Sequence, residues 1–402
     1  MYEIREAKEE DREQTVDMLV RVFKEIDGFE EGWIESWKNY MNRPEYEDWD
    51  YIATHNGKVV ANMAFFANSN NSIRGGAVRF GGVWAVATDT EHRRKGLFRG
   101  LYEQVFRSMK EKKITLSILE PSFHEAAQAA YEKVGYEVVE KRVHHEFTLS
   151  SLRPLKTSKR ITTRLLSDEN ESKVIAEIEK SMARFGSTVF TWPGFLIGGI
   201  KAGNFYIFEK DGKPVGCVNL GFVDRATGKD VYMMNAYFTS NEVIPSILEL
   251  VSQKAPDAAK VIWNCTPQIP VRALFQHAKS LHTKVEGEMM IRVIDFEGYC
   301  KSIKVSEKTS ESLIFRLIDK YCPWNDGTYR IECNKGTLTV ERIEDTTTPN
   351  LTLTPNELSR IVGGVESSSA LLELGLIKCE PEDAKKLDTL FPQDSFISYF
   401  RF

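Results

Sequence analysis

The sequence is poor in cysteine and lacks any long apolar run. Its six cysteines show no Cys-x-x-Cys spacing, and none precedes Cys217. This distribution fits reduced thiols better than a disulfide framework or a zinc site. No apolar run reaches the roughly 18 residues of a membrane span, and the charged opening "MYEIREAKEEDREQT" has no apolar signal core. We therefore expect a cytoplasmic location, no membrane span and no metal.

Basic residues are also in deficit. The 53 Lys and Arg residues are outnumbered by 58 Asp and Glu residues, which gives a formal net charge of −5. This balance argues against a nucleic-acid partner, because such proteins need a basic face that neutralises phosphates. It leaves room for a small anionic ligand at one local basic site.

The length indicates several domains. A chain of 402 residues is too long for one compact core and predicts two or three domains. Polar stretches rich in Ser, Thr and Lys lie at 150–160 and 301–312 and read as linkers. They predict three domains, residues 1–150, 151–300 and 301–402.

The first segment reads as an α/β domain with mixed strand directions. A short strand at Tyr2–Arg5 is followed by a helix, and Asn56-Gly57 joins two strands in a hairpin. The helix is predicted from a helically spaced apolar set, Val16, Leu19, Val20 and Phe23. A long strand, "VRFGGVWAVAT", then enters a basic turn, and a helix, a strand, a second helix and a last strand "YEVVEKRVHHEF" complete the domain.

The second segment repeats the first in outline. "IATHNGKVVA" finds a counterpart in "IFEKDGKPVG", with Gly212 in the place of Gly57. The counterpart of the long strand and helix, "KDVYMMNAYFTSNEVIPSILELV", has no Arg pair and no glycine between the two elements. We expect the second copy to keep the fold and to have lost the anion site.

The third segment reads as an α+β domain. "YRIECNKGTLTVERI" is a hairpin, and Thr354, Pro355 and Glu357 form a capping box at the start of a helix that Gly363 can stop. Short helices around Ala370 and Ala384 precede an aromatic tail, "FPQDSFISYFRF".

The basic turn, "EHRRKGLFRGLYEQVF", is the strongest candidate site. A strand that passes through Arg-Arg-Lys-Gly into a helix presents free N–H groups at the positive end of the helix dipole, and a pyrophosphate suits such a turn. A solvated basic helix start fits the local pattern equally well. The motifs of dinucleotide folds and P-loops, GxGxxG and GxxxxGK[ST], are absent.

This turn resembles the acetyl-CoA motif of the GNAT N-acetyltransferases, Arg/Gln-x-x-Gly-x-Gly/Ala. The motif is read here as Arg93, Arg94, Lys95, Gly96, Leu97 and Phe98, the last in place of the family's small residue. "AAYEKVGYEV" is similar to the family's closing motif. With "CPWNDG" and the terminal aromatic residue, the whole chain resembles the enhanced intracellular survival (Eis) acetyltransferases. That resemblance implies tandem GNAT folds with mixed, splayed sheets, followed by a domain similar to sterol carrier protein type 2.

The resemblance also implies residue roles in the first domain. The pantetheine arm of acetyl-CoA would lie along a free strand edge at Ala85, Val86 and Ala87, with the Val86 N–H as oxyanion donor; an ordinary buried strand would have the same composition. Tyr131 matches the general acid, although a packing role is the rival interpretation. Tyr136 and the histidines at 92, 124, 144 and 145 are expected to be structural.

The base implied by the resemblance is the C-terminal carboxylate, here that of Phe402. The ordinary pKa of this carboxyl group, ~3.5, lies roughly 7 units below that of an alkylammonium. Unless burial reduces this difference in pKa, the carboxylate must pass the proton through water or orient the amine. Trp33, Trp37 and Glu30 suit a cationic acceptor, and equally an amphipathic helix packed on another domain. Arg401 would repel a polycationic acceptor.

The sequence thus predicts an acetyl-CoA-dependent N-acetyltransferase that acts on a primary amine through a ternary complex. The resemblance implies self-association as a hexamer. The alternatives are a non-enzymatic protein that binds coenzyme A or a lipid, and an acetyltransferase for protein N-termini or lysines.

Overall fold

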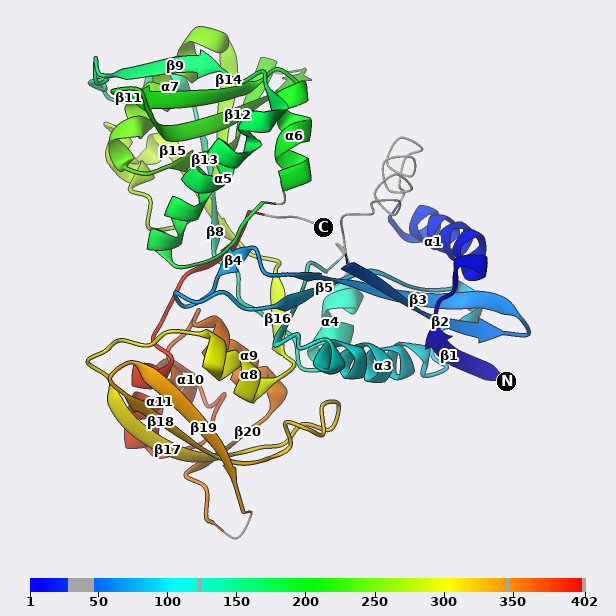
Figure 1. Ribbon diagram of the computed structural model, residues 1–402. Coiled ribbons are helices and arrows are strands. Elements are labelled where there is room, and N and C mark those ends of the chain that lie inside the picture. Colours follow the sequence, from blue (N-terminus) through cyan, green and yellow to red (C-terminus); the bar gives the residue numbers. More distant parts are fainter. Residues whose placement is uncertain (28–46, 122–124, 192, 227, 345–346, 400–402) are drawn as a thin grey trace.

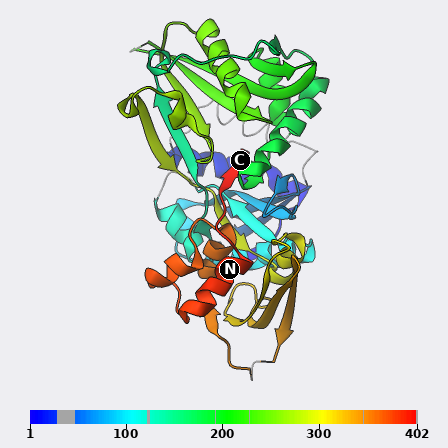
Figure 2. The same ribbon diagram turned by 90° about the vertical axis from the view of Figure 1, so that its left-hand side faces the viewer.

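The computed structural model describes residues 1–27, 47–121, 125–191, 193–226, 228–344 and 347–399, and it has three lobes (Figure 1). In Figure 1 the second domain is uppermost, the first lies to its lower right, and the third lies below. Figure 2 shows the red C-terminal segment running from the third domain to the lower edge of the second.

The first domain is built on a seven-stranded mixed sheet. In spatial order its strands are β1 (Tyr2–Glu6), β2 (Glu47–His55), β3 (Lys58–Asn68), β5 (Phe80–Thr88), β6 (Leu116–Leu119), β16 (Met290–Val293) and β7 (Glu137–Val138). Helix α1 (Arg12–Asp27) packs on one face, whereas α3 (Leu97–Glu111) and α4 (Glu125–Glu132) pack on the other. The sheet therefore has an α1 face and an α3 face.

Local patterns account for these elements. Asn56 and Gly57 adopt φ of 52° and 76° and turn β2 into β3, as the Asn-Gly pair predicts. Helix α1 also forms, but its buried stripe is shifted by about one residue from the predicted one. The buried members are Thr15, Met18, Leu19 and Val22, whereas Val16, Val20 and Phe23 flank them.

The second domain repeats this arrangement. Its strands are ordered β15 (Leu281–Glu286), β8 (Arg142–Phe147), β14 (Ala258–Cys265), β13 (Gly228–Phe238), β12 (Lys213–Arg225), β11 (Phe205–Lys210) and β9 (Ile161–Leu165). Its helices are α5 (Ser172–Lys180), α6 (Pro193–Lys201) and α7 (Ile244–Lys254). Asp211 and Gly212, with φ of 51° and 76°, form the hairpin that corresponds to Asn56-Gly57.

The two sheets exchange strands, so they do not divide at residue 150. The last strand predicted for the first domain, "YEVVEKRVHHEF", is split: β7 stays in the first sheet, and β8 inserts between β14 and β15 of the second. In return β16, from beyond the second domain's own strands, inserts between β6 and β7. The expectation of one continuous strand in the first domain was therefore wrong.

A small sheet joins all three domains. It contains β4 (Asn71–Ser72) of the first domain, β10 (Ser187–Val189) of the second and β21 (Phe396–Ser398) near the C-terminus. Strand β10 pairs antiparallel with β4 and parallel with β21. Asp394 accepts hydrogen bonds from the backbone and hydroxyl of Ser187 at 3.2 and 2.5 Å, which fixes the tail on the second domain.

The third domain has a four-stranded sheet with helices beside it. Its strands are ordered β19 (Thr337–Ile343), β18 (Gly327–Asn334), β17 (Ser310–Leu317) and β20 (Leu351–Leu353), and its helices are α8 (Phe296–Ser302), α9 (Pro355–Gly363), α10 (Ser368–Glu373) and α11 (Pro381–Leu390). The capping box of Thr354 and Glu357 forms as predicted. The left-handed residue that ends α9 is Gly364, with φ of 73°, and Gly363 is the last helical residue.

The apolar cores follow this organisation. One core combines the α1 face of the first sheet with the interior of the third domain, a second fills the α3 face, and a third fills the second domain. The predicted linker at 301–312 is shorter than expected, because α8 runs to Ser302 and β17 begins at Ser310. The third domain is therefore packed against the first rather than tethered to it.

Candidate active site

The basic turn leads from β5 into α3 with its backbone exposed. Arg94 and Gly96 adopt left-handed φ of 58° and 80°. Gly96 is the N-cap of α3, so the first backbone N–H groups of the helix come directly after the basic residues. Among the described residues, no side chain caps this helix, and a Cβ built on Gly96 would meet nothing within 4 Å. Exposed N–H groups at a helix start suit an anion such as a pyrophosphate.

The three cations of the turn are exposed and face solvent. Arg93 donates its Nε–H to the carbonyl oxygen of Thr88 at 3.2 Å, which ties the turn to the end of β5. The first turn of α3 contains no acidic residue, so nothing in it opposes an anion. Arg99, by contrast, is paired with Glu103 at 2.9 Å one turn further on.

Next to this turn the sheet is splayed. Strand β5 pairs with β6 only from Phe80 to Gly82, and the remainder of β5, up to Thr88, has no partner on that side among the described strands. Ala85, Val86 and Ala87 lie in this unpaired part and are buried or half-buried. From Val83 onward, the edge of β5 on the β6 side is therefore open among the described strands.

A bulge in β5 shapes that edge. The register with β3 shifts between Asn62 and Ala64, and Ala85 adopts a left-handed φ of 51°. Fully buried Asn62 donates from Nδ2 to the carbonyl oxygen of Ala85 at 3.0 Å and holds the bulge in place. The sequence does not indicate the role of Asn62. The residue with the left-handed φ is Ala85, whereas a glycine would have marked a bulge in the sequence.

Tyr131 lies on the α3 face, among other aromatic rings. Its ring centroid is 5.9 Å from that of Phe98 and 6.5 Å from that of Tyr102. It is 9% exposed, and burial raises the pKa of its hydroxyl above the ordinary value. Phe98, which departs from the family motif, thus supports Tyr131. Tyr136 packs beside them and shares a 2.6 Å hydrogen bond with Ser117.

The third domain braces the turn that follows Tyr131. Asn356 of α9 donates to the carbonyl oxygen of Glu132 at 2.9 Å, and Ser359 donates to that of Gly135 at 3.0 Å. Arg292 of β16 donates to the carbonyl oxygen of Val134 at 2.6 Å. The end of α4, and with it Tyr131, is therefore set by residues more than 150 positions away, which local pattern could not predict.

Several predicted residues do not meet here. Trp33, Trp37, Glu30, Arg401 and Phe402 lie outside the described residues. His144 and His145 lie on β8 in the second sheet, where His144 hydrogen-bonds with Asn264 at 2.8 Å. Burial and the neighbouring His144 lower the pKa of His145 to about 4, so this side chain is neutral at pH 7. His92 shares a 3.0 Å hydrogen bond with Tyr2.

Two family models match the chain. Residues 3–139 match the acetyltransferase (GNAT) domain, and residues 297–397 match the sterol carrier protein domain. The chain therefore contains a GNAT acetyltransferase domain and, near its C-terminus, a sterol carrier protein domain, in the order expected for an Eis-type architecture. No curated protein sequence matches it.

Solved structures share the fold of the chain over its whole length. A GCN5-related N-acetyltransferase from Anabaena variabilis is 16% identical, with a TM-score of 0.86 and 100% of both chains covered. A probable N-acyltransferase from Enterococcus faecalis is 16% identical at a TM-score of 0.85, and Eis1 from Mycobacterium abscessus is 15% identical at 0.78, each also with 100% of both chains covered. The tandem GNAT and sterol-carrier-like arrangement is thus confirmed.

Proposed function

We propose that the protein transfers the acetyl group of acetyl-CoA to a primary amine in a ternary complex within the first domain. The observation that carries the proposal is the open edge of β5 beyond its pairing with β6, beside an uncapped helix start. A thioester placed along this edge meets backbone N–H groups of the strand while its pyrophosphate meets the basic turn.

The turn and the edge would bind different parts of acetyl-CoA. The amides that follow Gly96, together with Arg93, Arg94 and Lys95, suit the pyrophosphate. The edge from Ala85 to Ala87 suits the pantetheine arm, because an amide chain can pair with a free strand edge as a further strand would. Leu97 is buried and Phe98 half-buried, so they would support the site from beneath.

The chemical step forms a C–N bond and breaks the C–S bond of the thioester. Negative charge gathers on the carbonyl oxygen, and the Val86 N–H beside the bulge is the proposed donor to it. The departing thiolate takes a proton from Tyr131. Since burial raises the pKa of Tyr131, its hydroxyl carries its proton when the reaction starts, as a general acid must, and it regains a proton from water after each turnover.

The amine must lose a proton, and we assign its removal to the C-terminal carboxylate of Phe402. A carboxylate of ordinary pKa is a weak base toward an alkylammonium. The carboxylate would therefore orient the amine and pass the proton through water. Described residues of the C-terminal segment, up to Tyr399, run between the second and third domains and approach the first (Figure 1).

The acceptor is expected on the α1 face, because the basic turn and α3 lie on the opposite face. Asp48 and Asp50 lie on this face of β2, and register places Asp50, Ala64 and Trp84 in one row across three strands. The Oδ1 atoms of both aspartates are shielded from water and have no hydrogen-bond partner among the described residues. Two such carboxyl groups favour a cationic acceptor, in line with Trp33, Trp37 and Glu30 as further acceptor residues.

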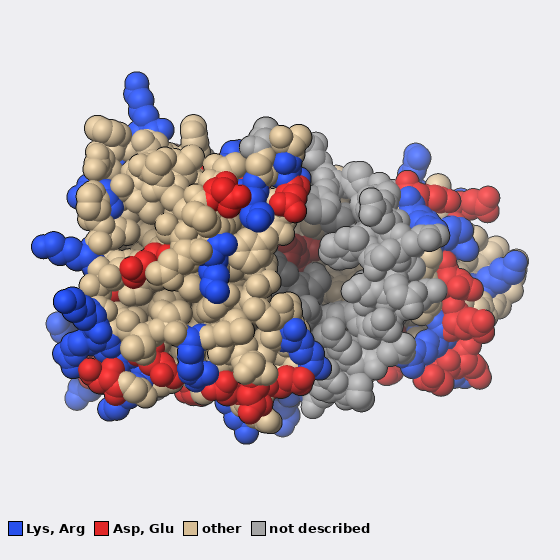
Figure 3. Space-filling model, turned by 90° about the horizontal axis from the view of Figure 1, so that it is seen from above, with Lys and Arg blue, Asp and Glu red and all other residues tan. Residues whose placement is uncertain are grey.

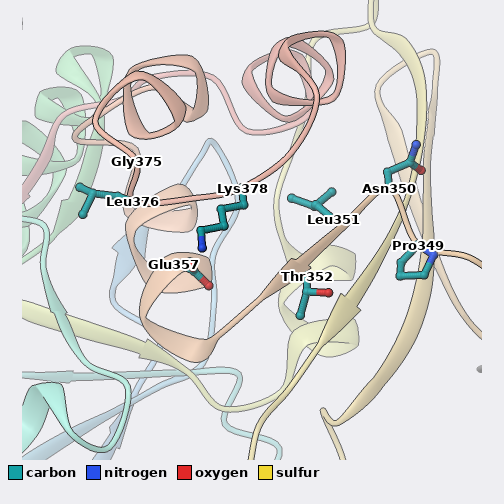
Figure 4. A pocket seen from close by; sticks show the side chains of 8 residues that line it. All are labelled: Pro349, Asn350, Leu351, Thr352, Glu357, Gly375, Leu376 and Lys378. Atoms are coloured by element: carbon teal, nitrogen blue, oxygen red, sulfur yellow. The ribbon is translucent and has the colours of Figure 1, made fainter.

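A lipid-binding function of the third domain is the rival, and a described pocket of this domain suits a lipid poorly. This cavity of about 490 Å³ is lined by Pro349, Asn350, Leu351, Thr352, Glu357, Gly375, Leu376 and Lys378 (Figure 4). It combines charged, polar and apolar groups, whereas an acyl chain needs a mostly apolar, enclosed site. Phe315, Ile331 and Leu358 fill the interior of the domain.

Self-association, as a hexamer, and a cytoplasmic location belong to the same proposal. Exposed apolar side chains on the second domain, Leu165, Phe222, Met234 and Val285, support an interface between copies. Figure 3 shows this domain from above with basic and acidic groups interspersed, so this face offers no broad basic patch for nucleic acid. None of the described helices is long and apolar enough to cross a membrane.

The test is mass-spectrometric detection of acetylated product from acetyl-CoA and a panel of polyamines, aminoglycosides, amino acids and lysine peptides. We expect a product from a small cationic amine. Acetylation of lysine peptides alone would favour the protein acetyltransferase alternative, and acetyl-CoA binding without any product would favour a binding protein. A variant extended by one glycine after Phe402 tests the terminal carboxylate, and unchanged turnover would remove Phe402 from the mechanism.

A further inference from the structure

The second sheet keeps the splay of the first. Strand β13 pairs with β14 only as far as Met233, although β14 continues to Cys265. The register between β12 and β13 shifts between Cys217 and Asn219, and Asn235 adopts a left-handed φ of 48°. The second domain therefore repeats both the bulge and the gap.

Register identifies the residues that correspond in the two gaps. Ala87 is opposite Asn62, whereas Tyr237 is opposite Cys217. Asn235 likewise takes the place of Ala85 at the bulge. Where the open edge of β5 has small alanines, the corresponding position of β13 has the large, buried side chain of Tyr237.

A second tyrosine comes from the C-terminal segment. Tyr399 follows β21 directly, and its ring centroid is 4.9 Å from that of Tyr237, with the rings edge to face. It packs against the core of the second domain, and its N–H donates to the carbonyl oxygen of Val189 at 2.9 Å. Burial raises the pKa of its hydroxyl, and Cys265 at the end of β14 raises it further.

A buried hydrogen-bond network holds the two tyrosines. Thr191 donates to Glu179 at 2.5 Å, shares a 2.7 Å bond with the Tyr237 hydroxyl, and lies 3.5 Å from the carbonyl oxygen of Tyr399. Asn235 donates to the Tyr237 hydroxyl at 2.6 Å. The bulge of the second sheet is thus linked to the backbone of the C-terminal segment.

We propose that the gap of the second sheet serves as a receptacle for the chain's own C-terminal segment, with Tyr399 as the positioning residue for the terminal carboxylate. In the first sheet the corresponding gap takes the arm of acetyl-CoA. This inference rests on the proposed function of that carboxylate. It gives the second domain a part in the reaction and implies one acetyl-CoA per chain.

The first experiment asks whether Tyr399 holds the segment, and it does not depend on activity. Hydrogen exchange followed by mass spectrometry compares the wild type with Tyr399→Ala and Tyr399→Phe over residues 396–399. We expect exchange to rise about tenfold or more in Tyr399→Ala and to stay unchanged in Tyr399→Phe, because the ring provides the packing. Equal exchange in all three proteins would overturn the receptacle.

The second experiment is a double-mutant cycle in the full-length protein. It measures kcat and KM with an acceptor from the amine panel for the wild type, Tyr399→Ala, the one-glycine extension and their combination. We expect Tyr399→Ala to lower kcat about tenfold or more, with the Kd for acetyl-CoA unchanged. The combined variant should be no slower than the extension alone, because both changes act on one carboxylate.

The outcomes separate the two proposals. If the extension leaves kcat unchanged, the carboxylate has no catalytic role and the proposed function fails at that point. If the extension abolishes turnover but Tyr399→Ala does not, or if the two losses multiply, the positioning role of Tyr399 is wrong. Calorimetric titration that finds two acetyl-CoA sites per chain would also overturn the receptacle.

Discussion

Arg292 and Asp319 form a 2.7 Å ion pair in which the side chains are only 0% and 2% exposed. Arg292 reaches this carboxylate from β16, stacks over the Phe106 ring at 4.5 Å, and donates to the end of α4. The amides of Tyr321 and Cys322 donate to the same Asp319 oxygen at 3.2 and 3.0 Å. One buried pair therefore connects the first sheet, the turn after Tyr131 and the third domain.

We predict that Asp319→Ala lowers the free energy of unfolding by about 3–5 kcal/mol, because it leaves the guanidinium buried without its counter-charge. Chemical denaturation measures this loss. The exposed helical pair of Lys180 and Glu177 supplies the control, since Glu177→Ala should cost far less. Equal costs at the two sites would contradict a structural role for the buried pair.

The double substitution Arg94→Ala with Lys95→Ala should weaken acetyl-CoA binding about tenfold or more, because each charged contact to a phosphate contributes about 1.5–3 kcal/mol. Calorimetry at two salt concentrations should find a smaller salt dependence in the variant. Arg99→Ala is the matched control, since Arg99 is paired with Glu103 on the same helix. Similar losses in both proteins would point to a general charge effect.

Tyr131→Phe should lower kcat about 100-fold if this hydroxyl protonates the leaving sulfur. The fold should survive, because the ring keeps its contacts with Phe98 and Tyr102. Since the pKa of Tyr131 is raised by burial, ionisation of this residue should leave no limb in the wild-type pH profile below pH ~10. Tyr136→Phe serves as the comparison, and a larger loss there would reassign the acid.

Asp48→Asn should raise the KM for a cationic acceptor and leave the Kd for acetyl-CoA unchanged. Burial and the neighbouring Asp50 raise the pKa of Asp48 to about 7, so its carboxylate gains from a positive partner. The increase in KM should therefore be larger at pH 8 than at pH 6. Asp17→Asn, at an exposed site on α1, is the control. A change in acetyl-CoA affinity instead would place Asp48 outside the acceptor site.

Glu179 makes stability depend on pH. Burial raises its pKa from 4.5 to about 7, so the folded state binds this proton more tightly than the unfolded state does. The resulting stabilisation is complete below pH 4.5 and is lost as the pH rises through 7. Glu179→Gln cannot ionise, so its free energy of unfolding should fall less between pH 5 and pH 8, by about 3 kcal/mol. Denaturation curves at both pH values check this, and parallel losses in the two proteins would refute it.

Features encoded within a few residues could be predicted from the sequence. The Asn56-Gly57 turn, the capping box at Thr354 and the passage from β5 through the basic turn into α3 each depend on neighbours along the chain. The domain repeat was also visible, because Gly212 marks the same hairpin as Gly57.

Features that depend on distant pairing could not be predicted. The alternating pattern of β8 predicts a strand but does not specify which sheet the strand joins. The exchange of β8 and β16 between the two sheets could therefore not be predicted. The positive φ of Ala85 depends on Asn62 from another strand. In the C-terminal segment, the aromatic pattern indicated insertion, but the partner of Tyr399 became identifiable only with the second sheet in place.

The strand exchange described above also bears on how the chain is made. On the ribosome, β6 is synthesised early, yet its neighbour β16 emerges only after about 170 further residues. Until then β6 is an exposed edge strand of the nascent first sheet. Such an edge can bind a chaperone or pair with a strand of another nascent chain. Because β8 and β16 each complete the sheet of the other copy, neither copy has its full set of strands without the other.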